Sequence, residues 1–297
     1  MDEPLLGKCA PRRIDHVISV CEAKDLGTWK LAAVRVLRHI RATSYELICP
    51  DAQVQAFRDA TPVGWQITGE SAYSANCSQE MIHRIALGAN RNRVNWIFQQ
   101  FLKINAAKAR DEDDIVLIWD ADTIPLRELE FIDPSDGKLL CYHSREVHQP
   151  YFDSMQKLLG FGKACEPSFI AQCLPVRAGW VTEMVCEIED RFSVPYPEAV
   201  MSVLPGISGS EFSEYETIGT WAWVKRPGEI ALRDRNRWMR RGSSFFGTSP
   251  GALRAKLLLA VMSWHFDFVA IENWKTPGLS SKLLTRIRKF RAGGGSI

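Results

Sequence analysis

Apolar and polar positions alternate in blocks over the first 70 residues. A β-branched apolar run at 15–20 predicts a strand, and apolar positions at helical spacing over 29–40 predict an amphipathic helix. The alternation continues with a predicted strand at 45–49, a polar helix at 52–60 and a strand at 65–68. Strands that alternate with helices indicate an α/β fold, in which helices flank a mostly parallel sheet.

The pattern changes in the middle of the chain. Residues 71–92 have no clear period, which predicts a long surface insertion, and 95–109 predict another helix. Ile115 to Trp119 is apolar throughout, as is typical of a central strand covered on both faces. This predicted strand ends abruptly at the sequence DADTIP, residues 120–125.

Two aspartates in this DADTIP segment are the clearest candidates for chemistry. In open α/β sheets, ligands bind beyond the carboxyl ends of the strands, which is where Asp120 and Asp122 fall. Two close carboxylates repel each other unless a cation lies between them, and hard oxygen ligands select Mg²⁺ or Mn²⁺. The pair therefore predicts a divalent ion that holds a nucleotide diphosphate. The alternative is a plain turn, in which Asp120 only caps the strand.

Composition and charge narrow the classes of protein. The 297 residues are 46% hydrophobic and 24% charged, which is typical of a globular chain, and the net charge of +2 gives no field that favours nucleic acid. None of the eight cysteines forms a C-x-x-C pair, so no zinc or thioredoxin signature is present. No secretory signal layout occurs at residues 1–13, and no apolar run reaches the roughly 18 residues of a membrane span. We therefore expect a reduced, cytoplasmic protein.

The segment VLIWDADTIPLRELEF, residues 116–131, resembles the D-x-D segment of GT-A glycosyltransferases, including glycogenin-like and galactosyltransferase-like enzymes. Three further segments are similar to a bacterial group of GT-A-like proteins. They are a W-x-x-Q-Q-x-x-K pattern from Trp96 to Lys103, the stretch 151–160, and FSEYE at 212–216. The chain departs from this group at Gln172, where the group carries a histidine.

The resemblance spans about residues 14–275 and implies one domain with a Rossmann-type, mostly parallel sheet. Residues 14–125 would form its nucleotide-binding half and 126–275 its acceptor-side half. Residues 276–297 would be a basic C-terminal extension. Apolar and basic positions separate at helical spacing over 279–290, which fits either a peripheral anchor on the inner membrane or a packed helix with a solvated face.

The resemblance also implies roles for residues around the D-x-D. Asp120 and Asp122, with Ala121 between them, would bind Mn²⁺ or Mg²⁺ and through it the diphosphate of a nucleotide sugar. Lys103 would contact the donor from the preceding helix, unless it is a solvated helix lysine. Many GT-A enzymes add a histidine from late in the chain as a third metal ligand. His265 is the best candidate here, with a core histidine as the alternative and with His143 and His148 behind it.

The first strand-to-helix loop of GT-A enzymes contacts the base and ribose of the nucleotide. Ser19, Val20 and Asp25 match that place, and an acid beside a ribose hydroxyl is chemically sensible. Any strand-to-helix loop can contain such residues, so the alternative is an ordinary connection.

The acids near the FSEYE motif are candidates for the acceptor side. Glycosyl transfer to a hydroxyl needs a carboxylate that removes a proton or stabilises the reacting sugar. Glu214 and Glu216 would share a face in an extended segment but not in a helix. Glu214 is preferred as the catalytic acid, and Glu211 is the reserve. The alternative is a helix N-terminus capped by Ser210 or Ser213, with the acids placed against the helix dipole.

Together these features predict transfer of a sugar from a nucleoside-diphosphate sugar, with UDP as the family's usual nucleotide, to a hydroxyl of a glycan or glycolipid. By resemblance, the setting is bacterial surface polysaccharide or lipopolysaccharide synthesis. Two alternatives stay open. One is a non-catalytic glycan- or nucleotide-binding protein, and the other is a metal-dependent nucleotidyltransferase or nucleotide-sugar hydrolase. A nucleotidyltransferase would usually show a glycine-rich basic loop after the first strand, whereas residues 21–27 contain one glycine.

Overall fold

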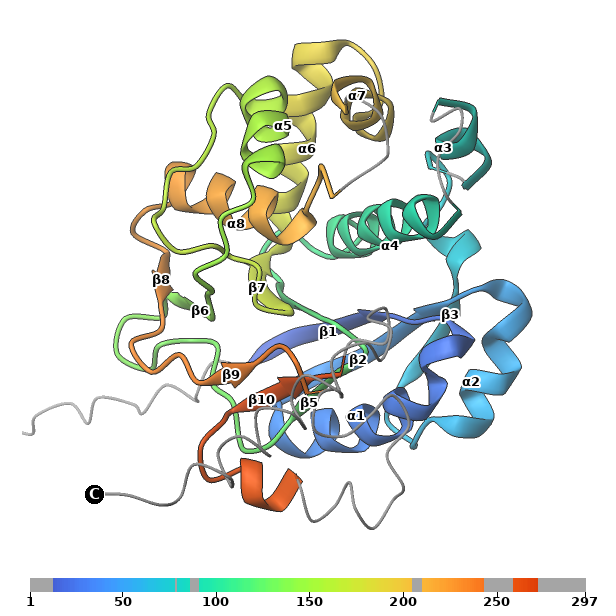
Figure 1. Cartoon of the computed structure of the whole chain (residues 1–297), viewed down its shortest axis with the longest axis vertical. Coiled ribbons are helices and arrows are strands. Elements are labelled where there is room, and N and C mark those ends of the chain that lie inside the picture. Colours follow the sequence, from blue (N-terminus) through green and yellow to red (C-terminus); the bar gives the residue numbers. More distant parts are fainter. Residues whose placement is uncertain (1–12, 78, 86–90, 205–209, 243–258, 272–297) are drawn as a thin grey trace, which may run out of the picture.

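The computed structural model of the chain describes residues 13–77, 79–85, 91–204, 210–242 and 259–271. The predicted basic extension at 276–297, with its amphipathic stretch at 279–290, lies outside the described residues. Figure 1 shows a central sheet with α1 and α2 beneath it and α4 above it.

The central sheet has five strands in the order β3-β2-β1-β4-β7. Neighbours among β3, β2, β1 and β4 pair in parallel, and β7 runs antiparallel to β4. The α/β fold with a mostly parallel sheet is therefore confirmed. The strands are β1 (Ile14–Val20), β2 (Ala42–Cys49), β3 (Gln66–Gly69), β4 (Ile115–Trp119) and β7 (Cys173–Arg177).

Helices α1, α2 and α4 connect and cover these strands in the first half. Helix α1 buries Trp29, Ala32, Ala33 and Val36, whose spacing of three to four residues places them on the face toward the sheet. Short 3-10 turns follow each of the first three strands. The helices are α1 (Leu26–His39), α2 (Val54–Ala60) and α4 (Arg91–Lys108), and the 3-10 turns are η1 (Ala23–Asp25), η2 (Asp51–Gln53) and η3 (Glu70–Ala72).

The expected insertion is more regular than its sequence indicated. Residues 71–92 contain helix α3 (Gln79–Ile85), and α4 already begins at Arg91. The lack of a hydrophobic period over residues 71–92 therefore failed to predict the helices that the structure contains there. A helix of seven residues makes only two turns, which is too short for a repeating apolar face to stand out.

The second half adds a helical layer and two small sheets. Helices α5, α6, α7 and α8 pack on one another and on α4. One small sheet has the order β5-β10-β9, and the other pairs β6 with β8. The helices are α5 (Gln149–Leu159), α6 (Ala178–Phe192), α7 (Tyr196–Val203) and α8 (Glu214–Lys225). The strands are β5 (Thr123–Pro125), β6 (Leu139–Cys141), β8 (Ile230–Leu232), β9 (Trp238–Met239) and β10 (Phe268–Ala270).

The β5-β10-β9 sheet fixes the segment that follows the two aspartates. β5 starts directly after Asp122 and pairs antiparallel with β10. The amide of Ile271 donates to the Asp122 carbonyl at 2.9 Å. Trp119 packs edge-on against Phe268, with 5.4 Å between ring centroids, which ties this small sheet to the central one. Among the described residues, no helix has the length and apolar character needed to cross a membrane.

Gly219 sets how closely α8 approaches the loop before β7. A Cβ atom at this position would lie 2.3 Å from Cγ of the buried Phe169. We expect Gly219→Ala to lower the free energy of unfolding by about 1–3 kcal/mol, because overpacking a tight contact outweighs the better helix propensity of alanine. Urea denaturation measures the difference.

Gly27 provides the matched control, because a Cβ there meets no atom within 4 Å. Gly27→Ala in α1 should leave stability unchanged or raise it by up to about 1 kcal/mol. Equal effects of the two substitutions would contradict the proposed tight contact at Gly219.

Candidate functional site

Acidic side chains follow the carboxyl ends of the four parallel strands. Glu22 follows β1, Asp51 follows β2, and Glu70 follows β3. Asp120 and Asp122 follow β4. Since this edge of a parallel sheet is where ligands bind in open α/β folds, the whole row is a candidate site.

The acids after β1, β2 and β3 approach one another closely enough to interact. Burial, followed by the negative charges of Glu22 and Asp51, raises the pKa of Glu70 to about 7. Asp51 reaches this place because Gly69 has no side chain, since a Cβ there would lie 2.0 Å from Asp51 Oδ1. Sequence reasoning missed these three acids. The signal that could have found them is their shared position, one or two residues after a predicted strand.

A buried lysine lies between two carboxylates at the end of β4. Lys103 Nζ donates to Asp120 Oδ1 at 2.5 Å and to Glu214 Oε1 at 2.6 Å. The side chains of Lys103, Asp120 and Glu214 are 10%, 21% and 5% exposed. The Tyr215 hydroxyl also donates to Asp120 Oδ1, at 2.6 Å. We call these four residues the Lys103 cluster.

Electrostatics keep the lysine of this cluster charged. Burial alone would lower the pKa of Lys103, but the carboxylates of Asp120 and Glu214 outweigh it, so that the pKa is raised. Burial raises the pKa of Glu214, and the ammonium of Lys103 opposes that rise. The pKa of the Tyr215 hydroxyl is raised as well, first by burial and then by Asp120. Tyr215 therefore stays protonated and acts as a hydrogen-bond donor.

Local capping explains how the Lys103 cluster assembles. Ser213 is the N-cap of α8, and its hydroxyl accepts from the Glu216 amide at 3.3 Å. The Glu214 amide donates to Gln100 Oε1 at 2.9 Å, and Gln100 lies one turn before Lys103 on α4. The predicted capped helix N-terminus is therefore present, with Ser213 as the cap.

Because the segment is helical, Glu214 and Glu216 do not share a face. Glu216 Oε2 accepts from the Ser168 hydroxyl and, at 3.1 Å, from the Phe169 amide. Glu216 thus ties α8 to the loop before β7 and lies outside the Lys103 cluster. Glu211, the reserve acid, is buried, and its Oε2 atom has no hydrogen-bond partner among the described residues.

The residues predicted to contact the nucleotide lie where the sequence placed them, at the end of β1 and after β4. The Ser19 hydroxyl donates to the Trp119 carbonyl at 2.7 Å, while Val20 and Ala121 are buried. Burial and then the charges of Asp25 and Asp122 raise the pKa of the Cys21 thiol. Both carboxylates therefore lie within electrostatic range of the end of β1. The nucleotide-binding roles of these residues stay predictions.

The backbone at Gln172 is unusual and supports Asp120 directly. Gln172 has a φ of 64°, a left-handed conformation that residues other than glycine rarely adopt. Its carbonyl accepts from the Asp120 amide at 3.0 Å. Such strained residues cluster at functional sites, where the surrounding structure must hold them.

None of the three candidate histidines completes a metal site in the described residues. His265 is exposed, in the turn after the helical residues 259–262. His143 contacts Asn236, and His148 Nε2 lies 2.5 Å from the Ser210 carbonyl oxygen. Within the described part of the chain, no group of three or more His, Cys, Asp or Glu residues is arranged to hold a metal ion. The third ligand therefore stays a prediction.

The two aspartates themselves suit a hard cation. Lys103 and Tyr215 both donate to Oδ1 of Asp120, so neither of these bonds uses the other oxygen, Oδ2. The partly exposed Asp122 adds a second carboxylate. Carboxylate oxygens are the donors that Mg²⁺ and Mn²⁺ prefer, and such ions take their remaining ligands from water and phosphate.

A family model described as a family of unknown function, DUF6492, matches residues 26–228. The chain belongs to this family. The matched range contains the whole Lys103 cluster and Asp122, whereas β1 and His265 lie outside it. A comparison with curated proteins finds no significant match.

Solved glycosyltransferase structures resemble the chain at low identity. Mouse xyloside xylosyltransferase 1, in its apo form, aligns with 10% identity and a TM-score of 0.47, over 89% of this chain and 99% of that one. The galactosyltransferase LgtC, in complex with donor and acceptor sugar analogs, aligns with 12% identity and a TM-score of 0.45, over 95% and 97%. GlyE of Streptococcus pneumoniae TIGR4 aligns with 12% identity and a TM-score of 0.39, over 90% and 56%. With TM-scores below 0.5, these similarities assign no activity to this chain.

The Lys103 cluster should behave as one energetic unit. Lys103→Met leaves the buried Glu214 and the partly buried Asp120 without their cation, so we expect it to lower the free energy of unfolding by about 3–5 kcal/mol at pH 7.5. In a Glu214→Gln background the same substitution should cost at least about 1 kcal/mol less, because one of the uncompensated charges is gone. Urea denaturation of the four members of this cycle measures the coupling.

Lys30→Met, at an exposed position on α1, is the control and should change stability by less than about 0.5 kcal/mol. Strictly additive effects of Lys103→Met and Glu214→Gln would contradict the ion pair.

The raised pKa of Glu70 predicts a pH-dependent loss of stability. The folded state holds the Glu70 proton up to about pH 7, whereas the unfolded state releases it near pH 4.5. The contribution of Glu70 to the free energy of unfolding is therefore greatest below pH 4.5 and is lost as the pH rises through 7. Glu70→Gln mimics the protonated side chain. After allowance for solvent screening, we expect this variant to be about 1 kcal/mol more stable than the wild type at pH 8 and equal to it near pH 4.5.

Thermal unfolding from pH 4.5 to 8 in EDTA checks this expectation. Glu112→Gln, at an exposed position before β4, is the control and should follow the wild-type profile. A Glu70→Gln profile parallel to the wild type over the whole range would exclude the raised pKa.

Proposed function

We propose that this chain is a metal-assisted glycosyltransferase, which moves a sugar from a nucleoside-diphosphate sugar to a hydroxyl of a glycan or glycolipid. The observation that carries the proposal is the Asp120–Asp122 pair at the carboxyl end of the central strand β4, with Lys103 and Tyr215 both bound to one oxygen of Asp120. This arrangement supports a cation site beside the place where a nucleotide binds in an open α/β sheet.

Each part of the site takes a role that follows from its contacts. Asp122 and Asp120 Oδ2 would hold Mg²⁺ or Mn²⁺, which when bound supplies neutralisation of the departing diphosphate. Lys103 and Tyr215 fix the Asp120 carboxylate in one orientation. Glu22 and Glu70 can accept hydrogen bonds from ribose hydroxyls, since they lie at the carboxyl ends of β1 and β3 on the same edge of the sheet. Asp25 would share this role.

We assign Glu214 to positioning rather than to proton transfer. Its Oε1 atom is held by the Lys103 ammonium at 2.6 Å, and its side chain is almost fully buried. A general base must reach the proton that it removes, which such burial disfavours. Glu214 and Asp120 instead both pair with the Lys103 ammonium, so Glu214 contributes to the charge beside the proposed cation site.

The resemblance to GT-A enzymes supports UDP as the first nucleotide to test and surface polysaccharide or lipopolysaccharide synthesis as the setting. The acidic edge formed by Glu22, Asp51 and Glu70 favours neutral hydroxyl groups at the β1–β3 side of the sheet. Phosphates, in contrast, need a cation and would lie toward Asp120 and Asp122.

Thermal unfolding with nucleoside diphosphates tests this proposal. UDP with Mn²⁺ should raise the unfolding midpoint by several degrees, since a ligand at 100 times its Kd adds about 2.7 kcal/mol to stability. Asp122→Asn should remove the shift, whereas Asp153→Asn, an exposed acid on α5, should keep it. Release of UDP from a UDP-sugar by the wild type, and not by Asp122→Asn, would then establish turnover.

The outcomes separate the alternatives. A metal-dependent shift without any turnover of nucleotide sugars would favour the non-catalytic binding protein. No shift with any nucleotide, from a folded protein, would overturn the proposed donor site.

A further inference from the structure

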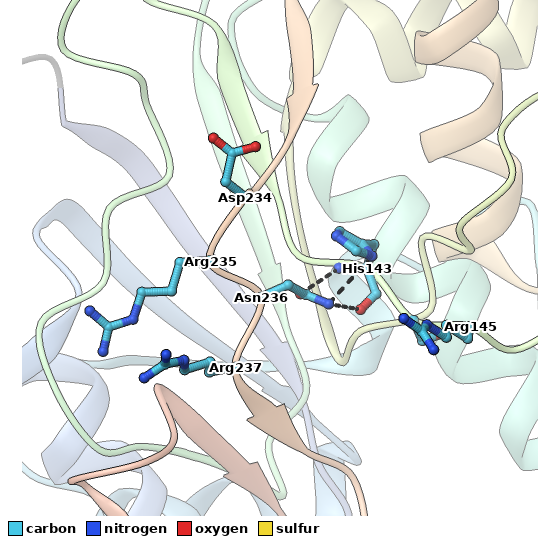
Figure 2. A pocket seen from close by; sticks show the side chains of 7 residues that line it. His143, Arg145, Asp234, Arg235, Asn236 and Arg237 are labelled. Atoms are coloured by element: carbon cyan, nitrogen blue, oxygen red, sulfur yellow. Dashed lines mark hydrogen bonds between the residues drawn. The ribbon is translucent and has the colours of Figure 1, made fainter.

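A pocket of about 690 Å³ lies between two loops of the second half, away from the acidic edge of the sheet. One wall is formed by His143, Ser144 and Arg145, which follow β6. The other wall is the segment Asp234–Arg237 between β8 and β9. Figure 2 shows Asn236 and His143 in contact between these walls. The volume is in the range of small-molecule sites.

Hydrogen bonds hold the two walls together. Asn236 Oδ1 accepts from the His143 amide at 3.1 Å, and Asn236 Nδ2 donates to the His143 carbonyl at 2.7 Å. The indole of Trp238 donates to the same carbonyl at 2.9 Å. The walls are therefore fixed before any ligand arrives, which lowers the entropic cost of binding.

The pocket carries a positive charge that the described protein does not neutralise. Its three arginines, against Asp234, give a net charge of +2. Acids nearby are engaged elsewhere, since Glu146 pairs with Arg240. Arg145, Arg235 and Arg237 are exposed, and within the described part of the chain their guanidinium groups have no hydrogen-bond or ion-pair partner.

The arrangement of two of these arginines suits a single anion with several oxygens. Arg235 and Arg237 are two residues apart, so their Cα atoms lie within about 7 Å of each other. Figure 2 shows both side chains on the side of the segment opposite Asn236 and His143, with the Asp234 carboxylate pointing away from both. Two planar guanidinium forks match the geometry and charge of a phosphate group.

Backbone pairing fixes where one wall of the pocket lies relative to β5. β9, which follows Arg237 directly, pairs with β10, and β10 pairs with β5. In this register Trp238 and Pro125 both face Phe268, so Arg237 lies level with Leu126. The pocket is therefore two strand spacings, about 10 Å, from the chain after β5, at the end of that strand that points away from Asp122.

We propose that this pocket binds the phosphate group of a phosphorylated saccharide, either free or linked to a lipid, with Arg235 and Arg237 as the phosphate ligands and Arg145 on the opposite wall. Phosphate binding stands on the pocket alone. That the phosphate belongs to a saccharide rests on the proposed function.

Calorimetric titration with glucose 1-phosphate, in EDTA and 50 mM salt, tests phosphate binding without any contribution from a metal at the aspartates. The wild type should bind glucose 1-phosphate and not glucose. Arg235→Gln/Arg237→Gln should weaken binding at least tenfold, and higher salt should weaken it in the wild type. Arg38→Gln/Arg58→Gln removes the same charge from exposed positions on α1 and α2 and should bind like the wild type.

A second arm distinguishes the source of the phosphate. Vesicles of phosphatidylcholine with phosphatidic acid are floated with the wild type and with the two double variants. A loss of vesicle binding confined to Arg235→Gln/Arg237→Gln supports a lipid-linked saccharide, and a loss of glucose 1-phosphate binding alone supports a soluble one. Equal binding of both probes by all three proteins, or binding of neither probe by the wild type, would overturn the proposal.

Asp122→Asn separates this proposal from the donor site. It should bind glucose 1-phosphate in EDTA as the wild type does, while losing the thermal shift with UDP and Mn²⁺. Arginine-dependent phosphate binding without a thermal shift from any nucleotide would support the phosphate-binding pocket and overturn the proposed glycosyltransferase activity. A thermal shift from a nucleotide without arginine-dependent phosphate binding would support the glycosyltransferase activity and overturn the phosphate-binding pocket.

Discussion

The ion pairs of Lys103 with Asp120 and Glu214 are the interaction on which the site depends. One buried ammonium lies between two carboxylates, so it reduces the negative charge at the end of β4 only while α4 and α8 stay in place. Removing one partner of a buried ion pair destabilises the fold far more than removing one partner of an exposed pair, because the remaining buried charge has neither water nor a partner. The cluster thereby couples the helical layer to the central sheet at the aspartates.

Several local contacts hold α8 in that position. Gly219 allows contact with Phe169, Ser213 caps the helix, and Glu216 binds the loop before β7. The same loop passes through the strained Gln172, whose carbonyl holds the Asp120 amide. Glu216, which the sequence predicts as a candidate for acceptor chemistry, thus contributes to the support of Asp120 through this loop.

The two sides of the molecule differ in charge in a way that fits two kinds of ligand. The sheet edge gathers acids after β1, β2 and β3, which suits hydroxyl groups, or phosphate that arrives with a cation. The pocket between the β6 and β8 loops carries unpaired arginines, which suits an anion without a metal. The β5-β10-β9 sheet lies between the two places, since β5 follows Asp122 and β9 follows the pocket wall.

The sequence by itself determined the alternation of strands and helices, the apolar strand at 115–119 and the position of Asp120 and Asp122 at its end. These are local properties, because periodicity and the carboxyl end of a strand can be read within a few residues. Only the tertiary structure decided that Lys103, Glu214 and Tyr215 meet at Asp120, since they come from helices 111 residues apart in the chain. It also separated Glu216 from Glu214 by making the segment helical, and it brought together Glu70, Glu22 and Asp51 from three strands. Such contacts depend on which strands become neighbours and how closely two helices pack, and neither leaves a period in the sequence.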